Sequence, residues 1–303
     1  MTDATTESTP DEAVARLLAM LDLEPLEVDL FRGTNPTMWP GARVFGGLVA
    51  SQALRAGINS VDVDHHIHSL HGYFLRPGKP GDPIVYHIDR IRNGKSFTTR
   101  RVNAVQNGEA IFTMACSFHR EGEEGDDYQL PRSADAPVPE ELDDRDGGFP
   151  SRPSFFQPFE MREVGPTEPE PDGTYRSTRR VWVKTAAGLP DDPAVHACVL
   201  TFMSDMAVVL AVRPPTPGQP WAGFMGASLD HAVWFHRRIR ADEWMLYDLH
   251  SLSFFNARGL ARGAMHSLDG TLGVSVTQEA LVRTLPEGTM PPGMTPPPEV
   301  GRT

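Results

Sequence analysis

The stretch "YFLRPGKPGDPIVYHID" at residues 73–89 decides the fold, because the similar stretch "WFHRRIRADEWMLYDLH" occurs 161 positions later, at residues 234–250. After one inserted residue the similarity continues, and "FTTRRVNAVQNGEAIFTMACSF" (97–118) aligns with "GLARGAMHSLDGTLGVSVTQEA" (259–280). Self-similarity at a fixed separation is typical of a repeated structural unit. The sequence therefore predicts two halves with one architecture.

Each half contains the same predicted elements in the same order. Asn-Gly at 107–108 and Asp-Gly at 269–270 lie between segments of alternating polarity, and both suit the tight primed turns of β-hairpins. A segment of small and apolar residues precedes the strands in both halves, at 46–57 and at 195–209, and could form a buried helix. This pattern predicts an α+β tandem (double) hotdog, in which each antiparallel sheet wraps around a central helix. A β-sandwich would explain the hairpins but not the two helices.

The composition along the chain divides it into four regions. We expect an N-terminal hotdog domain at 1–120 and a C-terminal one at 151–285. Residues 121–150 are acidic and rich in Pro and Gly, which indicates a linker. The Pro-rich composition of residues 286–303 predicts a disordered tail.

The first domain should open with an amphipathic helix. Thr9 is placed as its N-cap, Pro10 lies in its first turn and Glu12 occupies the capping-box position. Residues 26–30 then alternate in polarity as a short strand.

The charge of the chain limits its partners. A formal net charge of −12 argues against a general nucleic-acid-binding protein, which needs a basic surface to neutralise phosphates. An anionic ligand must therefore bind at a local cluster of basic residues, because the protein as a whole is negatively charged. Such clusters occur at residues 90–101, 176–184 and 237–240, although solvated strand edges would explain any one of them alone.

The sequence favours a cytoplasmic protein without membrane insertion. No apolar run approaches the roughly 20 residues that span a bilayer, and the first residues are acidic where a signal peptide is basic. Cys116 and Cys198 are the only cysteines, which suits a reducing compartment.

Ser228, Asp230 and His231 lie within four positions and suggest a serine hydrolase. However, no G-x-S-x-G motif surrounds the serine. On a regular strand Ser228 and Asp230 would share one face while His231 points to the other. Adjacent Asp and His also cannot form the Ser-His-Asp line that this mechanism needs, so we expect Asp230 and His231 to be structural.

Two further kinds of site have weaker support. His66 and His68 would project from one strand face, but no third ligand accompanies them, so we expect no metal site. A hotdog hydratase would need an Asp and a His near the "RGTNPTMWP" segment at 32–40, and neither stands at the required place.

Asp205, Ser228 and Gln278 form the remaining candidate site. Asp205 lies within an apolar helix, where desolvation makes a carboxylate costly unless it is hydrogen-bonded or functional. A purely structural contact of Asp205 with a neighbouring strand remains an equal alternative at this point. The first half places other residues near the three corresponding positions, namely Gln52, His68 and Cys116. Only the second half therefore combines a carboxylate, a hydroxyl and a carboxamide.

Residues from about 10 to 285 resemble the acyl-CoA thioesterase II (TesB-like) family of double-hotdog enzymes. The resemblance rests on several motifs in order, among them "RVFGG" (43–47), "HSLHGYFLRPG" (68–78), "RNGKSFTTRRV" (92–102), "SDM" (204–206), "LDHAVWFHR" (229–237) and "TQE" (277–279). It implies a catalytic Asp, Thr or Ser, and Gln that hold the attacking water, and these fall on Asp205, Ser228 and Gln278. Bacterial members often have Thr where this chain has Ser228.

The resemblance implies hydrolysis of medium- to long-chain fatty acyl-CoA to free fatty acid and CoA. No cofactor is expected, because coenzyme A is part of the substrate. Coenzyme A carries phosphates, so basic residues should contact it, and the candidates are Arg90, Arg92, Lys95, Arg258 and Arg262. Hotdog sheets have exposed edges, so we expect a homo-oligomer, at least a dimer of double hotdogs. An enoyl-CoA hydratase and a non-catalytic acyl-CoA-binding protein remain as alternatives.

Overall fold

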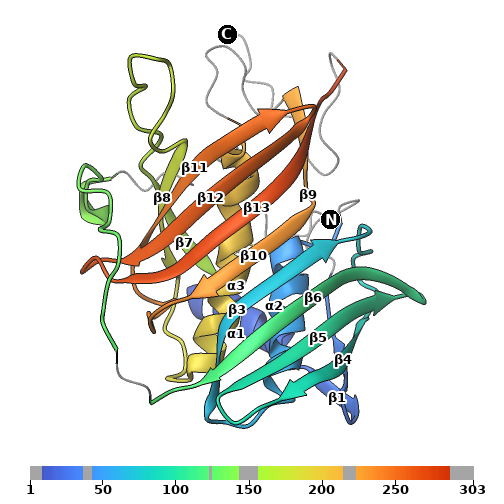
Figure 1. Ribbon diagram of the computed structural model, residues 1–303. Helices are drawn as coiled ribbons and strands as arrows, with labels where there is room; N and C mark the ends of the chain where they lie inside the picture. Colours follow the sequence, from blue (N-terminus) through green and yellow to red (C-terminus); the bar gives the residue numbers. More distant parts are fainter. Residues whose placement is uncertain (1–8, 37–42, 123–124, 143–155, 214–222, 287–303) are drawn as a thin grey trace.

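The computed structural model describes residues 9–36, 43–122, 125–142, 156–213 and 223–286. One large antiparallel sheet forms the front of the molecule, and the three α-helices found within these ranges lie behind it (Figure 1). The predicted tail at 286–303 lies outside the described residues except for Pro286.

Apart from α1 and the additional strand β9, the elements of the two halves follow the same order. The N-terminal half comprises α1 (Pro10–Leu21), β1 (Glu24–Glu27), β2 (Leu30–Gly33), α2 (Gly46–Ile58), β3 (His65–Phe74), β4 (Ile84–Asn93), β5 (Phe97–Gln106) and β6 (Glu109–Arg120). The C-terminal half comprises β7 (Phe159–Glu163), β8 (Arg179–Thr185), α3 (Pro193–Ala211), β9 (Phe224–Ser228), β10 (Asp230–Phe235), β11 (Met245–Phe255), β12 (Arg258–Ser267) and β13 (Leu272–Thr284). A short 3₁₀ helix, η1 (Pro139–Glu141), lies between them.

The strand order shows that the two halves are copies joined at their central strands. The order is β1-β2-β4-β5-β6-β3-β10-β13-β12-β11-β8-β7, and β9 pairs with β13 beside this path. Reading outward from the β3–β10 junction gives the same sequence of strands on both sides. The junction is antiparallel, with Leu70 opposite Val233. Since each half-sheet covers its own central helix, the predicted α+β double hotdog is confirmed.

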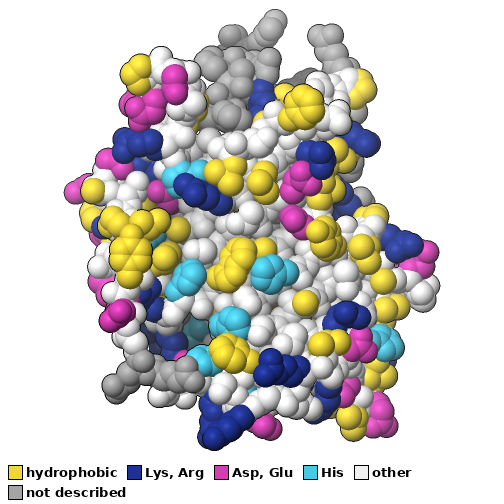
Figure 2. All heavy atoms as spheres, viewed as in Figure 1, with side chains coloured by type: hydrophobic (Ala, Val, Ile, Leu, Met, Phe, Trp, Pro, Cys, Tyr) yellow, Lys and Arg dark blue, Asp and Glu magenta, His cyan; other side chains and the backbone are white. Residues whose placement is uncertain are grey.

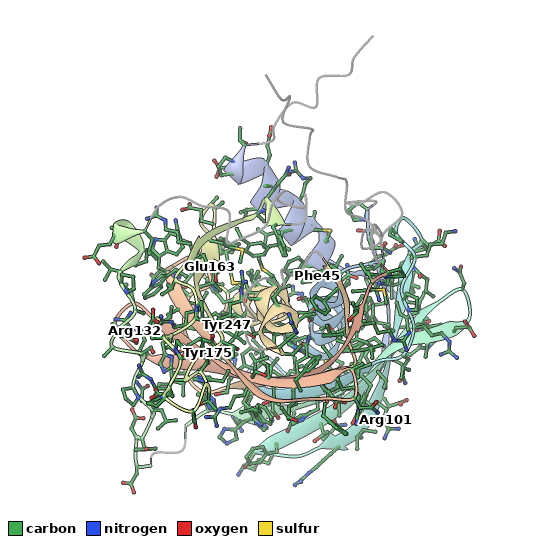
Figure 3. All side chains as sticks on the ribbon, turned by 90° about the horizontal axis from the view of Figure 1, so that it is seen from above. Phe45, Arg101, Arg132, Glu163, Tyr175 and Tyr247 are labelled. Carbon is green, nitrogen blue, oxygen red and sulfur yellow. The ribbon has the colours of Figure 1, made fainter. Side chains whose placement is uncertain are left out.

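The two central helices pack against each other through small residues. The Ser51 hydroxyl in α2 donates to the Cys198 carbonyl of α3 at 2.9 Å and lies 2.7 Å from the Gly47 carbonyl of its own helix. The Phe45 ring, just before α2, lies 4.9 Å from the ring of Phe202. Seen from above, α2 and α3 lie next to each other over the curved sheet, with Phe45 beside α2 and Tyr247 beside α3 (Figure 3).

Helix α3 is far more apolar than the sequence analysis allowed. The helix has 19 residues, and a window of 18 of them has a mean hydropathy of 1.8, so by length and composition alone the helix could cross a membrane. The prediction that no apolar run approaches this length is therefore wrong. The physical reason is that the sheet on one side and α2 on another enclose α3, so 78% of this window is buried and nearly every face must be apolar.

Several local predictions can be compared with the structure. The Thr9–Glu12 capping box of α1 is confirmed, as is the tight turn at 107–108, where both residues have positive φ. In the turn at 269–270 only Gly270 has positive φ, so the two hairpins differ. The single strand predicted for 26–30 is wrong, because a turn with Asp29 at φ 58° separates β1 from β2.

Part of the predicted linker contacts the outer face of the C-terminal sheet. The Trp182 indole donates to the Pro137 carbonyl at 2.8 Å, and Arg132 lies over the same ring at 5.1 Å from its centroid. Ala136 packs with Trp182 and Leu246 in a small apolar cluster. This segment therefore covers strands that would otherwise expose large apolar side chains.

Candidate active site

A β-bulge between β9 and β10 shapes the candidate site. Ser228 of β9 pairs with Ala280 of β13, whereas Ala232 of β10 pairs with Thr277, so the β9–β10 side contains one extra residue. Leu229 lies at this break, and its N–H donates to the Glu279 carbonyl while its carbonyl accepts from the Phe74 N–H, both at 2.9 Å. A bulge of this kind redirects the side chains on either side of it.

The structure brings Asp205, Ser228 and Gln278 together, as the sequence analysis predicted. The Ser228 hydroxyl donates to Oδ1 of Asp205 at 3.1 Å, and Nε2 of Gln278 donates to Oγ of Ser228 at 2.8 Å. The Gln278 side chain also hydrogen-bonds Asp205. Asp205 and Gln278 are buried, whereas Ser228 is partly exposed. The three side chains come from α3, β9 and β13, so this site belongs to the second half.

The first half contributes the N-terminus of α2 to the same site. The Gly47 backbone N–H donates to Asp205. A Cβ atom at Gly46 would lie 2.8 Å from Oδ2 of Asp205, and one at Gly47 would lie 2.6 Å from the Phe202 carbonyl. Glycine is therefore needed at both positions for α2 to approach α3 this closely. Unpaired N–H groups at a helix N-terminus also favour nearby negative charge.

Burial changes the acid–base properties of Asp205. Loss of hydration raises the pKa of its carboxyl group from 3.8 to about 6, although hydrogen bonds from Gln278, Ser228 and Gly47 oppose the shift. Asp205 is therefore ionised at neutral pH but has a pKa close enough to neutrality to accept and return a proton. This is the property that a general base requires.

His231 lies next to this site, contrary to the prediction that it faces away from Ser228. The bulge adds one residue between them, so both side chains point toward α3. Nδ1 of His231 hydrogen-bonds Oε1 of Gln278, and Nε2 lies 2.6 Å from Oγ of Ser204. Asp230 instead accepts a hydrogen bond from the Glu279 backbone N–H at 2.6 Å. None of these contacts forms a Ser-His-Asp line.

Among the described residues of the first half, the positions that correspond to the candidate site do not form an equivalent polar group. The sequence comparison placed Gln52 near the position of Asp205, but Gln52 donates to the Met20 and Thr34 carbonyls and accepts from Tyr86. The α2 residue next to Cys116 is Gly57, whose Cβ position lies 3.1 Å from Sγ. The Tyr247 hydroxyl, at the place in β11 equivalent to Tyr86 in β4, donates to the Ser204 carbonyl beside Asp205, so Gln52 does lie near the equivalent position. It does not join Cys116 in a polar group.

The basic residues predicted to contact coenzyme A are dispersed. Arg90 and Lys95 line a cavity of about 400 Å³ whose wall includes Ser60, beyond the C-terminal end of α2 and thus at the opposite end of that helix from Asp205. Arg90 is paired with Asp29 at 2.8 Å. The remaining candidates, Arg92, Arg258 and Arg262, are exposed. Of these, Arg258 is paired at 3.2 Å with Glu279, which follows Gln278 in β13.

One of the two histidines that suggested a metal site has another side-chain partner. His68 hydrogen-bonds Oγ of Ser117 at 2.8 Å. A different group, Asp62, Asp64 and His65, has ligand atoms within 4.8 Å of one another. The Asp64 carboxylate, however, already pairs with Arg120 at 2.8 Å and with Nδ1 of His65 at 2.9 Å. These ion pairs explain the cluster without a cation.

Sequence reasoning missed two contributions to the site, Gly46–Gly47 and the direction of His231. The glycine pair at the start of a predicted helix was a usable signal, since glycine there lets a backbone approach closely. The bulge left no local signal, because it is defined by the register of β9 and β10 against a distant strand.

Comparisons with known proteins agree with this fold. Family models for the N-terminal and C-terminal domains of acyl-CoA thioesterases match residues 35–119 and 132–282. Human acyl-coenzyme A thioesterase 8 is 37% identical over 287 residues, covering 88% of this chain and 89% of that protein.

Two solved structures are also similar. The acyl-CoA thioesterase II TesB2 from Mycobacterium marinum superposes with a TM-score of 0.76 and 39% identity over 90% of this chain and all of its own. A hotdog protein of unknown function from Alicyclobacillus acidocaldarius has a TM-score of 0.71 and 17% identity over 89% of this chain and 98% of its own, which shows the fold alone. The chain therefore belongs to the TesB-like acyl-CoA thioesterase II family, whose members are thioester hydrolases.

Proposed function

We propose that this protein hydrolyses medium- to long-chain fatty acyl-CoA through a water molecule held by Asp205, Ser228 and Gln278. The observation that carries the proposal is the hydrogen-bonded group of these three side chains beside the N-terminus of α2. A buried carboxylate with a raised pKa, two neutral polar partners and backbone donors are the components that such a hydrolysis needs.

In the proposed mechanism the water oxygen attacks the thioester carbonyl carbon while Asp205 takes one water proton. Ser228 and Gln278 hold the water in place, so the entropic cost of positioning it near the carbonyl is met before the chemical step. The developing oxyanion is proposed to accept from a backbone N–H in the first turn of α2 other than that of Gly47, which donates to Asp205. The tetrahedral intermediate then breaks its C–S bond, and the CoA thiolate takes the proton from Asp205. No enzyme side chain is acylated.

The acyl chain is proposed to extend along α3. Next to Asp205 this helix offers apolar side chains, including Phe202, Met203 and Val208. An apolar environment of this kind favours a long alkyl chain, because each buried methylene contributes about 0.8 kcal/mol. Contacts with the CoA phosphates are proposed for the five basic candidates named above.

Release of free CoA thiol from acyl-CoA substrates of chain length C2 to C20 tests this function. We expect thiol release with a preference for medium to long chains. An enoyl-CoA hydratase would instead form 3-hydroxyacyl-CoA without releasing thiol. An acyl-CoA-binding protein would bind the substrates without turnover at any chain length. Either of these results would contradict the proposed hydrolysis.

The pH dependence of kcat/KM should reflect the raised pKa of Asp205. The carboxylate form is the active base, so kcat/KM should rise with pH through about 6 and reach a plateau above it. Below this value the rate should fall about tenfold per pH unit. Because the phosphates of CoA also titrate, the control is an N-acetylcysteamine thioester, which has none. A flat profile with this substrate from pH 5 to 8 would contradict the role of Asp205.

The proposed setting is a cytoplasmic homo-oligomer that needs no cofactor and does not insert into membranes. The free thiols of Cys116 and Cys198 suit a reducing compartment. The burial of α3 supports a core helix. Histidine and apolar side chains gather near the centre of the sheet face seen in Figure 2. In the β3–β10 part of the sheet His71 is exposed, and its ring lies 5.0 Å from that of Trp234. Such a face is typical of an interface between subunits, which sedimentation equilibrium can test.

A further inference from the structure

The buried chain of polar contacts continues beyond Gln278. His231, which is fully buried, lies between Oε1 of Gln278 and Oγ of Ser204. Gln278 itself is fully buried, and its Nε2 faces Ser228 and Asp205. The carboxamide therefore separates the proposed water site from an internal histidine that does not touch it.

The ionised state of Asp205 fixes the direction of the hydrogen bonds that link it, through Gln278, to His231. An ionised carboxylate only accepts hydrogen bonds, so Gln278 must present its NH₂ group to Asp205 and Ser228. Its Oε1 then points away and requires a donor. Nδ1 of His231 is the group at that place, so Nδ1 must carry a proton.

Burial determines the state of the other imidazole nitrogen. Loss of hydration lowers the pKa of His231 to about 4, so the ring is neutral at neutral pH. A neutral ring with a proton on Nδ1 has a bare Nε2, which accepts a hydrogen bond. The Ser204 hydroxyl has one hydrogen and two acceptors within reach, Nε2 at 2.6 Å and the Thr201 carbonyl at 2.8 Å, and a bare Nε2 requires that this hydrogen point to the imidazole.

We propose that His231 is a positioning residue for the hydrolysis, because its Nδ1–H holds the Gln278 amide in the one orientation that directs NH₂ toward Ser228 and Asp205. The opposite orientation would place Oε1 against a carboxylate, and two acceptors repel each other. The His231 ring contacts neither substrate nor water in this account. This inference rests on the function proposed above. It adds His231 as the group that fixes the orientation of the Gln278 carboxamide.

The bulge at Leu229 makes this arrangement possible. A regular strand would turn either Ser228 or His231 toward the outer face. The extra residue allows both to face α3, with one on each side of Gln278. The other titratable groups around this row of hydrogen-bonded side chains are Asp205 on α3, Tyr247 on β11 and Asp230. The Tyr247 hydroxyl donates to the Ser204 carbonyl at 2.7 Å.

The test compares His231→Leu with His231→Asn. Leucine fills the space without a donor, whereas the Asn amide nitrogen can take the place of Nδ1–H. We expect His231→Leu to lower kcat by about 10- to 100-fold with little change in KM, because the carboxamide loses its fixed orientation. The acid limb of its pH profile should move to higher pH, since Asp205 loses a donor that favours its charged form. His231→Asn should retain most of kcat, and the acid limb of its pH profile should stay at the wild-type pH, although the smaller side chain leaves a cavity.

Each outcome decides the question. Wild-type kcat and pH profile in His231→Leu, or an equal loss of kcat in folded His231→Asn, would overturn the positioning role. If neither variant folds, two-bond ¹H–¹⁵N spectra of the wild-type imidazoles provide the test, and the His231 signals are assigned by elimination with folded variants of the other histidines. A proton on Nδ1 supports the proposal and a proton on Nε2 overturns it. The proposed function fails separately, if Asp205→Asn keeps wild-type turnover.

Discussion

Replacing Asp205 with Asn is expected to lower kcat by about 10²- to 10⁴-fold, the range typical of losing a general base. The substitution keeps the shape of the side chain but removes its ability to take a proton. Because the variant still fills the position between α3 and α2, substrate binding should change little. Thiol release under saturating acyl-CoA measures the effect.

The same variant should be more stable than the wild type at neutral pH. The pKa of Asp205 is raised in the folded state, so the folded protein binds more protons than the unfolded one between pH 3.8 and about 6. The contribution of Asp205 to stability is therefore most favourable below pH 3.8 and is lost as pH rises through about 6. Asn avoids this loss, and the gain in unfolding free energy at pH 7.5 should be roughly 1–3 kcal/mol. An unfolding free energy at pH 7.5 equal to or lower than that of the wild type contradicts this prediction, whereas wild-type turnover contradicts the predicted loss of kcat.

Replacing Gly47 with Ala is expected to lower kcat/KM by about 100-fold or more and to destabilise the protein by about 1–3 kcal/mol. The new Cβ would lie 2.6 Å from the Phe202 carbonyl, a backbone atom that cannot rotate away, so α2 and α3 must separate. This movement withdraws the Gly47 N–H from Asp205. Steady-state kinetics and urea unfolding measure the two effects.

Gly57→Ala in the same helix is the matched control. Its Cβ would lie 3.1 Å from Sγ of Cys116, a side chain that can yield slightly, and Ala is favoured over Gly in a helix by about 0.5–1 kcal/mol. We expect kcat/KM close to that of the wild type. Equal losses in the Gly47 and Gly57 variants would show that α2 responds to any added methyl group, and the specific role of its N-terminus would then be wrong.

The fold was predictable because its signals are local and repeated. The hairpin at 107–108 and the apolar segments at 46–57 and 195–209 each depend on short-range periodicity, and the similarity of the two halves supports each assignment twice. Asp205 was found because a carboxylate in an apolar helix is energetically unusual. Its partners Ser228 and Gln278 came from strand positions and from the family resemblance.

The rest of the site depends on tertiary register. His231 faces Ser204 only because β9 and β10 differ by one residue in their pairing with β13, and no sequence pattern around Leu229 indicates that difference. The approach of Gly47 to Asp205 joins the two halves of the chain, so periodicity within either half could not reveal it. Alternation alone therefore assigned His231 to the wrong face.

In the proposed mechanism a water molecule held by Asp205, Ser228 and Gln278 attacks the thioester without an acyl-enzyme. A single turnover of acyl-CoA in H₂¹⁸O, with mass spectrometry of both the fatty acid and the digested enzyme, tests this step. We expect one ¹⁸O atom in the fatty acid carboxylate, no ¹⁸O in Asp205 and no acyl group on Ser228 during the reaction. An acylated Ser228, or ¹⁸O in the Asp205 carboxylate, would contradict this mechanism.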